Sequence, residues 1–122
     1  MLLKIAMVFI GGGLGSVLRF ACSSVLYRWA GGWPLGTWFV NLVGSFLIGL
    51  FAGYLMSGDS GNYWYRLLLI TGFCGGFTTF SAFSFENIQL VQEGMFLKFF
   101  LYAVSSVSLG LLFVFLGLKI SQ

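Results

Sequence analysis

Nearly all of this chain consists of apolar stretches that are each long enough to cross a lipid bilayer. Of its 122 residues, 59% are hydrophobic and only 7% are charged, whereas a soluble domain normally carries about 25% charged residues. One crossing needs roughly 20 apolar residues, so about four spans fit, and no separate soluble domain does. We therefore predict an all-α integral membrane protein with a single domain of four transmembrane helices.

Turn residues and interfacial aromatic residues divide the chain into these spans. Glycine, tryptophan and proline at 31–34, a polar stretch at 57–62 followed by aromatic residues at 63–65, and the Glu93–Gly94 pair mark the connections. We predict helices over residues 2–27, 36–56, 63–92 and 96–120. The first stretch lacks a clear small-residue cleavage site and continues through Arg19, so we expect it to be retained as a span and not removed as a signal peptide.

The third span contains a segment that does not fit a continuous helix. Residues 71–85 include three glycines and the adjacent pair Thr78 and Thr79, and we predict an interruption at residues 75–79. Non-helical backbone survives at membrane depth only where it is buried in protein or lines a polar cavity. The interruption is therefore the predicted place for an ion or a polar substrate.

Small and polar residues recur every four positions on two other spans, where they allow helices to approach closely. We interpret the glycines as packing positions. A buried amide costs roughly 2 kcal/mol or more unless it is hydrogen-bonded, so Asn41 either lines a polar pathway or bonds another helix. The two rows are Asn41, Ser45, Gly49 and Gly53 in the second span and Tyr102, Ser106 and Gly110 in the fourth.

Aromatic and hydroxyl side chains follow the interruption side by side. Phe80 and Phe83 share one helical face, and Ser81 and Ser84 lie on the adjoining face. Aromatic ring edges are electropositive and hydroxyls donate hydrogen bonds, so together they suit an anion. Core packing is the alternative for the pair, because the chain has 15 phenylalanines.

Two ionisable residues, Arg19 and Glu86, lie well inside predicted spans and away from their ends, where charge is rare and often functional. Arg19 either extends toward the membrane surface or acts electrostatically at a vestibule. Glu86 lies about two turns beyond the interruption and is either an interfacial carboxylate or a residue at a pore mouth.

Basic residues are divided almost evenly between the two membrane faces. The positive-inside rule requires a clear excess of Lys and Arg on one side, so insertion in both orientations is predicted, with a weak bias to one orientation as the alternative. No basic run of the kind that binds nucleic acid occurs. The side with the termini has Lys4, Arg66 and Lys119, and the opposite side has Arg28 and Lys98.

The sequence offers no catalytic or metal-binding constellation. Cys22 and Cys74 are isolated, and there is no histidine, so we interpret both cysteines as small buried hydrophobic residues. No nucleophile–base pair is evident, and we do not expect an enzyme.

Three motifs resemble those of the Fluc (CrcB) fluoride channels of microbes, and the resemblance covers all four spans. They are GGLGSVLRF at 12–20, GTWFVN at 36–41 and GFCGGFTTFSAF at 72–83, of which the last is highly specific. The resemblance implies an antiparallel, dual-topology homodimer in the inner or plasma membrane of a microbe. It further implies passive export of cytoplasmic fluoride through two pores, with a structural sodium ion at the dimer centre.

The resemblance also assigns roles to individual residues. It implies that Phe80 and Phe83 form an aromatic box for fluoride and that Asn41 donates a hydrogen bond to the ion. Hydroxyls of Ser81, Ser84, Tyr102 and Ser106 would continue the pathway, and main-chain carbonyls of Gly75 and Thr78 would bind sodium. Independently of the resemblance, the charge of Arg19 and Glu86 within the spans predicts a vestibule or electrostatic role for both.

Two other functions share the chain's size and charge balance. The first is a small dual-topology, proton-coupled exporter of organic cations, which requires a membrane-embedded acid. The first two spans contain no acid, so Glu86 is its only candidate. The second is a structural subunit that packs against other membrane proteins and transports nothing alone.

Overall fold

The computed structural model describes residues 1–56 and 62–122, and every regular element in those two ranges is helical. Four helical spans are long and apolar enough to cross a membrane, so the predicted all-α, four-span fold is confirmed. The predicted polar connection at 57–62 lies almost wholly outside the described residues. The elements are α1 (Leu2–Tyr27), α2 (Leu35–Met56), the third span formed by α3 (Asn62–Tyr65), η1 (Arg66–Cys74), α4 (Gly75–Phe77) and α5 (Phe80–Gln92), and α6 (Phe96–Ile120).

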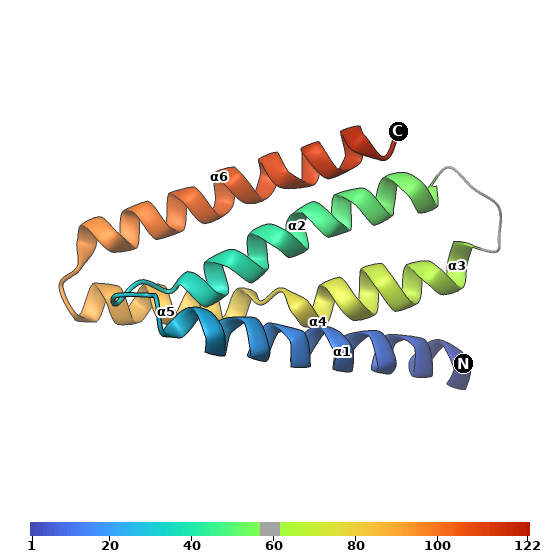
Figure 1. Cartoon of the computed structure of the whole chain (residues 1–122), viewed down its shortest axis with the longest axis horizontal. Coiled ribbons are helices and arrows are strands. Elements are labelled where there is room, and N and C mark those ends of the chain that lie inside the picture. Colours follow the sequence, from blue (N-terminus) through green and yellow to red (C-terminus); the bar gives the residue numbers. More distant parts are fainter. Residues whose placement is uncertain (57–61) are drawn as a thin grey trace.

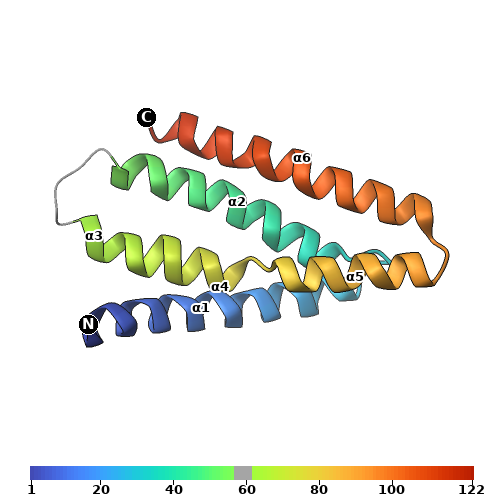
Figure 2. The ribbon, with the colours of Figure 1, turned by 180° about the vertical axis from the view of Figure 1, so that it is seen from behind.

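The spans lie alongside one another in an up-and-down bundle (Figures 1 and 2). The most extensive packing joins α2 to α6 and α1 to η1, and α2 also packs against α1 and η1. The α2 and α6 helices run in the same direction, and both chain termini lie at one end of the bundle (Figure 1). This arrangement places the interruption of the third span beside α2.

Short turns reverse the chain at the other end of the bundle. Gly31 and Gly32 have φ angles of 53° and 83°, and Gly94 has a φ angle of 73°. These left-handed conformations are strained for residues with a Cβ atom. Glycine therefore permits the tight connections from α1 to α2 and from α5 to α6.

Glycines bring the backbones of neighbouring spans into direct contact. A Cβ atom at Gly11 would overlap the Leu68 carbonyl oxygen of η1, and one at Gly49 would overlap the Val114 carbonyl oxygen of α6. Helices in a bilayer associate through such close packing, because lipid tails are as apolar as the side chains. The packing interpretation is confirmed for Gly49 and Gly53, whereas, among the described residues, a Cβ atom at Gly110 would meet only Ser45 Oγ, at 3.6 Å.

The third span is interrupted as predicted, but over a narrower segment. Residues 66–74 form a π-helix, and Gly75–Phe77 complete one further helical turn. Thr78 and Thr79 are extended, with φ and ψ of −87° and 156° and of −150° and 118°, and α5 then begins at Phe80. Gly75 and Gly76 therefore do not break the helix themselves. They lie in its last turn, where Gly76 packs on the Gly12 backbone of α1.

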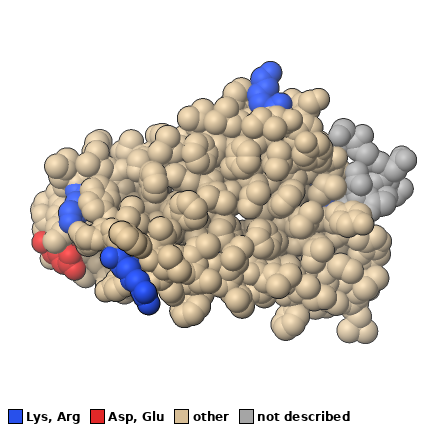
Figure 3. Space-filling view, in the orientation of Figure 1, with Lys and Arg blue, Asp and Glu red and all other residues tan. Residues whose placement is uncertain are grey.

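The outer surface of the bundle is apolar, as a membrane requires. Large hydrophobic side chains such as Phe9, Val17 and Leu111 are 79%, 68% and 69% exposed. On the face in Figure 3 the central surface carries no charged side chain, and the acidic atoms lie at the end where α5 meets α6. This apolar surface matches a chain that lies in lipid.

We predict that Gly15→Ala destabilises the protein, because a Cβ atom at Gly15 overlaps the Phe73 carbonyl oxygen and the helices must separate. The temperature at which the purified protein loses its monodisperse gel-filtration peak should fall by about 5–10 °C, as expected for overpacking in a small protein. Gly13→Ala is the matched control, since a Cβ atom there has nothing within 4 Å. Equal melting of the two variants would contradict the packing assignment.

Candidate functional site

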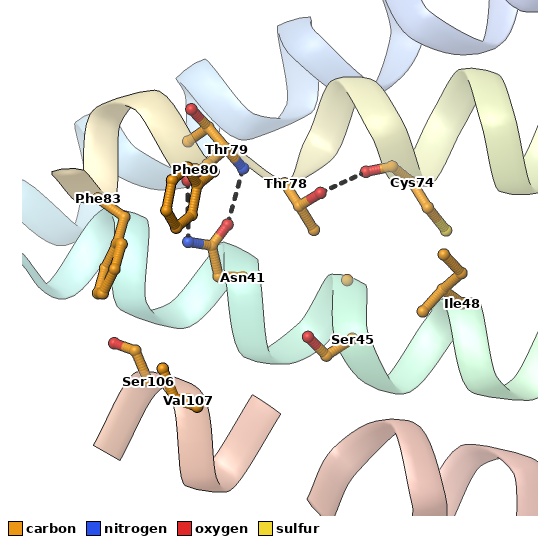
Figure 4. Close-up of a pocket in the computed structure, with 11 residues that line it drawn as sticks. Asn41, Ser45, Ile48, Cys74, Thr78, Thr79, Phe80, Phe83, Ser106 and Val107 are labelled. Atoms are coloured by element: carbon orange, nitrogen blue, oxygen red, sulfur yellow. Dashed lines mark hydrogen bonds between the residues drawn. The ribbon is translucent and has the colours of Figure 1, made fainter. Parts of the chain in front are cut away.

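The interruption in the third span is held by a single side chain from α2. Asn41 Nδ2 donates to the Thr79 carbonyl oxygen at 3.1 Å, and the Thr79 N–H donates to Asn41 Oδ1 at 2.8 Å (Figure 4). The side-chain amide thus pairs with both backbone groups of one residue in the broken segment. Because unpaired backbone groups are costly in hydrocarbon, this double contact explains how the chain tolerates the break.

Hydroxyl groups satisfy the backbone on either side of the break. Thr79 Oγ1 accepts from the Ala82 N–H at 3.2 Å and so caps the N-terminus of α5. The same oxygen lies 3.1 Å from Ser81 Oγ. Thr78 Oγ1 donates back to the Cys74 carbonyl oxygen at 2.8 Å. The two threonines therefore form part of the support of the break.

The break deprives several carbonyl groups of their usual donors. In an α-helix the Gly75 and Thr78 carbonyls would accept from the N–H groups four residues later, which belong to Thr79 and Ala82. Those N–H groups bond Asn41 and Thr79 Oγ1 instead. The Gly75 and Thr78 carbonyl oxygens, which were predicted to bind a cation, thus lack the N–H groups that would bond them in a regular helix.

Arg19 binds a third carbonyl at the same helix end. Its Nε donates to the Gly76 carbonyl oxygen at 3.0 Å, and Ser16 Oγ donates to that oxygen at 3.4 Å. The C-terminal end of a helix carries partial negative charge, which favours a cation. Arg19 is therefore a support of the broken helix, a role that neither sequence-based alternative anticipated.

A cavity of about 320 Å³ opens beside the break between α2, the third span and α6 (Figure 4). None of the described residues that line it is charged, so its polar side chains are a neutral amide, hydroxyls and a thiol. Such a lining can replace part of an ion's hydration shell without trapping the ion. The lining residues are Asn41, Gly44, Ser45, Ile48, Cys74, Thr78, Thr79, Phe80, Phe83, Ser106 and Val107.

Two phenylalanine rings form one wall of this cavity. The centroids of Phe80 and Phe83 lie 5.7 Å apart with planes inclined at 39°. Phe83 also packs against the buried ring of Tyr102, with centroids 5.2 Å apart. Phe80, in contrast, is 78% exposed in the single chain. The Phe83 ring is therefore held by Tyr102 of the same chain, whereas most of the Phe80 ring is left uncovered.

Glu86 is bonded by two hydroxyls, although the sequence suggested no partner. Thr37 Oγ1 donates to Oε1 at 2.6 Å, and the Tyr102 hydroxyl donates to Oε2 at 2.7 Å. This cluster joins α2, α5 and α6. Glu86 also lines a second cavity of about 630 Å³ next to the turn at 31–34, together with Glu93. Glu86 thus lies between the bundle interior and its polar end.

The structure gathers only some of the predicted ion-pathway residues around one cavity. Asn41, Phe80, Phe83 and Ser106 line it, with the predicted sodium ligand Thr78. Gly75, Ser81 and Ser84 do not line it. Tyr102 does not line it either, but its ring packs against Phe83, which does. Arg19 and Glu86 lie outside it, and each bonds polar groups of other spans.

Sequence reasoning missed Thr79 and Thr37. A threonine directly before an apolar run is a known N-terminal helix signal, so Thr79 could have been assigned as a cap. Nothing near Thr37 in the sequence indicates its bond to Glu86, since 49 positions separate them. Of the cysteines, Cys74 is buried as expected and lines the cavity, whereas Cys22 is only partly buried.

Residues 6–118 match the protein family described as CrcB-like protein, Camphor Resistance (CrcB). Curated relatives named fluoride-specific ion channel FluC include those of Aquifex aeolicus, 49% identical over 111 residues and 90% of each chain, and Flavobacterium psychrophilum, 47% identical over 116 residues and 94% of each chain. The relative from Phocaeicola vulgatus is 45% identical over 120 residues and 98% of each chain. With the four spans, these relatives support a multi-pass protein of a bacterial membrane.

We predict that Asn41→Asp destabilises the protein at the broken segment, although the two side chains have nearly the same shape. A carboxylate has no N–H for the Thr79 carbonyl oxygen and is repelled by it, and leaving a buried acceptor unpaired costs about 1–3 kcal/mol. The gel-filtration melting temperature should fall. Gln92→Glu, the same chemical change on an exposed residue of α5, should leave it unchanged. An Asn41→Asp protein as stable as the Gln92→Glu protein would contradict this role.

Proposed function

We propose that this chain, which belongs to the CrcB-like protein family, is a channel through which fluoride leaves the cell passively. The observation that carries the proposal is the uncharged cavity at the broken third span, lined by an amide, hydroxyls and two phenyl rings. The name of these relatives, fluoride-specific ion channel FluC, supports the same function. Because these relatives are ion channels, the chain is not expected to be an enzyme.

The chemistry of the cavity suits a small, strongly hydrated anion. Fluoride must exchange water for other hydrogen donors, yet it must not bind so tightly that it cannot leave. The Asn41 amide and Ser106 hydroxyl are neutral donors, and phenyl ring edges carry partial positive charge. A fixed cation in the cavity would hold the anion more strongly. Arg19, whose side chain reaches the broken helix end, instead bonds the Gly76 carbonyl oxygen.

We place the complete pore at a contact between two copies of the chain. Phe80 is 78% exposed, and Gly75 and Ser81 beside it are exposed as well. A broken backbone at membrane depth must be buried in protein or line a polar cavity. A second copy in the opposite orientation would cover this surface, and the even division of basic residues favours such dual insertion. A dimer of this kind has two equivalent pathways.

The carbonyl oxygens at the break fit a structural sodium ion at the dimer centre. Gly75 and Thr78 lack their regular helical donors, and carbonyl oxygens are the ligands that a hard monovalent cation prefers. Each copy would contribute the same two oxygens. The bound ion would supply a fixed positive charge near the pathway, while the chain's own residues orient its ligands through the Asn41–Thr79 contact.

We assign Glu86 and Arg19 to the surroundings of the pathway. Glu86 holds Tyr102, whose ring supports Phe83, and it faces the cavity next to the turn at 31–34. Arg19 fixes the end of the first half-helix. Ser81 and Ser84, which lie outside the cavity of the single chain, would reach the pathway only in the dimer.

Fluoride efflux from liposomes tests the aromatic wall. We predict that the unmodified protein releases fluoride and that Phe80→Ile and Phe83→Ile each lower the rate by at least about tenfold, because aliphatic groups present no electropositive edge to the ion. A fluoride electrode measures the rate. Phe115→Ile, on the exposed face of α6, is the control and should retain normal efflux. Normal efflux in both test variants would refute the aromatic wall.

Insertion in both orientations is tested by labelling one cysteine at the C-terminus. In a Cys22→Ala, Cys74→Ala background, Gln122→Cys should react to about one half with a membrane-impermeant maleimide in intact cells, because the charge balance gives no strong bias. Labelling after lysis measures the total. Complete or absent labelling in intact cells would show a single orientation and rule out the antiparallel dimer.

A further inference from the structure

We propose that the Ser45 hydroxyl is a further donor to fluoride, located one helical turn along α2 from Asn41. The inference rests on the proposed channel function and assigns a ligand role to a residue that the sequence pattern indicated only as a packing position. It specifies where the ion goes after it passes the Asn41 amide.

Ser45 lies in the same cavity as the groups already assigned to the ion. It follows Asn41 by four positions, about one helical turn, and both side chains line the cavity (Figure 4). One turn of an α-helix advances about 5–6 Å. The cavity therefore continues beyond the Phe83 and Ser106 level, and Ser45 lines the continuation.

The hydrogen of the Ser45 hydroxyl is available for a ligand. Serine and threonine in helices commonly bond the carbonyl oxygen four residues earlier, and here Thr78 and Ser121 do so at 2.8 and 2.9 Å. Ser45 Oγ makes no such bond, and it has no other hydrogen bond to residues 1–56 or 62–122. Ser106 Oγ, the hydroxyl that α6 contributes to the cavity, is buried and also has no partner among the described residues. Both hydroxyls thus lack a protein acceptor.

The facing position on α6 carries no side chain. A Cβ atom added at Gly110 would lie 3.6 Å from Ser45 Oγ. Gly110 follows Ser106 by one helical turn, and α6 runs parallel to α2. The two helices therefore present Asn41 with Ser106 at one level and Ser45 with Gly110 at the next. At this second level Ser45 supplies the hydroxyl, and Gly110 leaves the space open.

The remaining lining at this level cannot take over the role of Ser45. Ile48 is apolar, and the Cys74 thiol is a weak donor. The Thr78 hydroxyl already donates to the Cys74 carbonyl oxygen. An anion that leaves the Asn41 amide without a further donor must either keep its water or cross an apolar stretch. Loss of one hydrogen bond to a charged ligand is expected to slow passage by about tenfold or more.

The first test compares two serine-to-alanine changes in reconstituted full-length protein. Ser45→Ala should lower fluoride efflux by about tenfold or more, whereas Ser108→Ala, on the exposed side of α6, should not change it. Gel filtration checks that both variants are assembled. Normal efflux from Ser45→Ala would overturn the inference.

The second test separates the hydroxyl from the shape of the side chain. Gly110→Ser in the Ser45→Ala background returns a hydroxyl to the same part of the cavity, and efflux should recover to within about threefold of the unmodified protein. If the double variant does not assemble, Ser45→Thr and Ser45→Val provide a second comparison with nearly equal shapes. Fluoride efflux through the Ser45→Thr variant should exceed that through the Ser45→Val variant by about tenfold. Slow efflux in both hydroxyl-containing variants, or equal rates for Thr and Val, would show a packing role and overturn the inference.

The unmodified protein distinguishes this inference from the proposed function. If it releases no fluoride, the channel function fails, whatever Ser45 does. If it releases fluoride, and Ser45→Ala does so equally fast, only the role of Ser45 fails.

Discussion

The cost of an unpaired backbone group in hydrocarbon is the constraint on which the rest of this structure depends. Thr78 and Thr79 leave the helix in the middle of a span, where no water is available to their N–H and C=O groups. Asn41 meets both groups of Thr79 at once. That contact ties the break to α2, and the cavity lies where the broken span, α2 and α6 meet.

Hydrogen bonding divides the polar side chains into two groups. The charged ones near the break are occupied by the protein itself, since Arg19 bonds the Gly76 carbonyl and Glu86 accepts from two hydroxyls. Among the described residues, the cavity side chains with donor hydrogens left over are Ser45, Ser106 and, through the second hydrogen of its amide, Asn41, and all three are neutral. This division gives an anion ligands without a fixed opposite charge, which favours passage over tight binding.

Much of the fold followed from the sequence, because it depends on local and additive properties. Span number and class follow from apolar length, and the chain reversals follow from glycines such as Gly31 and Gly94. The interruption was anticipated from its glycines and threonines, but its narrower extent, Thr78 and Thr79 alone, was not. Gly75 and Gly76 remain helical because Gly76 packs on α1, and helix packing of this kind is invisible in a local pattern. The π-helical turn at 66–74 likewise left no sequence signal that we can name.

The sequence by itself determined that this is a four-span membrane protein with a polar, broken third span, and it singled out Asn41, Phe80, Phe83 and Ser106. Only the tertiary structure decided which polar groups are already bonded and which remain free. Arg19, Glu86 and Tyr102 have partners 57, 49 and 16 positions away, while Ser45 has none among the described residues. The physical reason is that a hydrogen bond between helices depends on their rotation and depth relative to each other, which packing of the whole bundle sets.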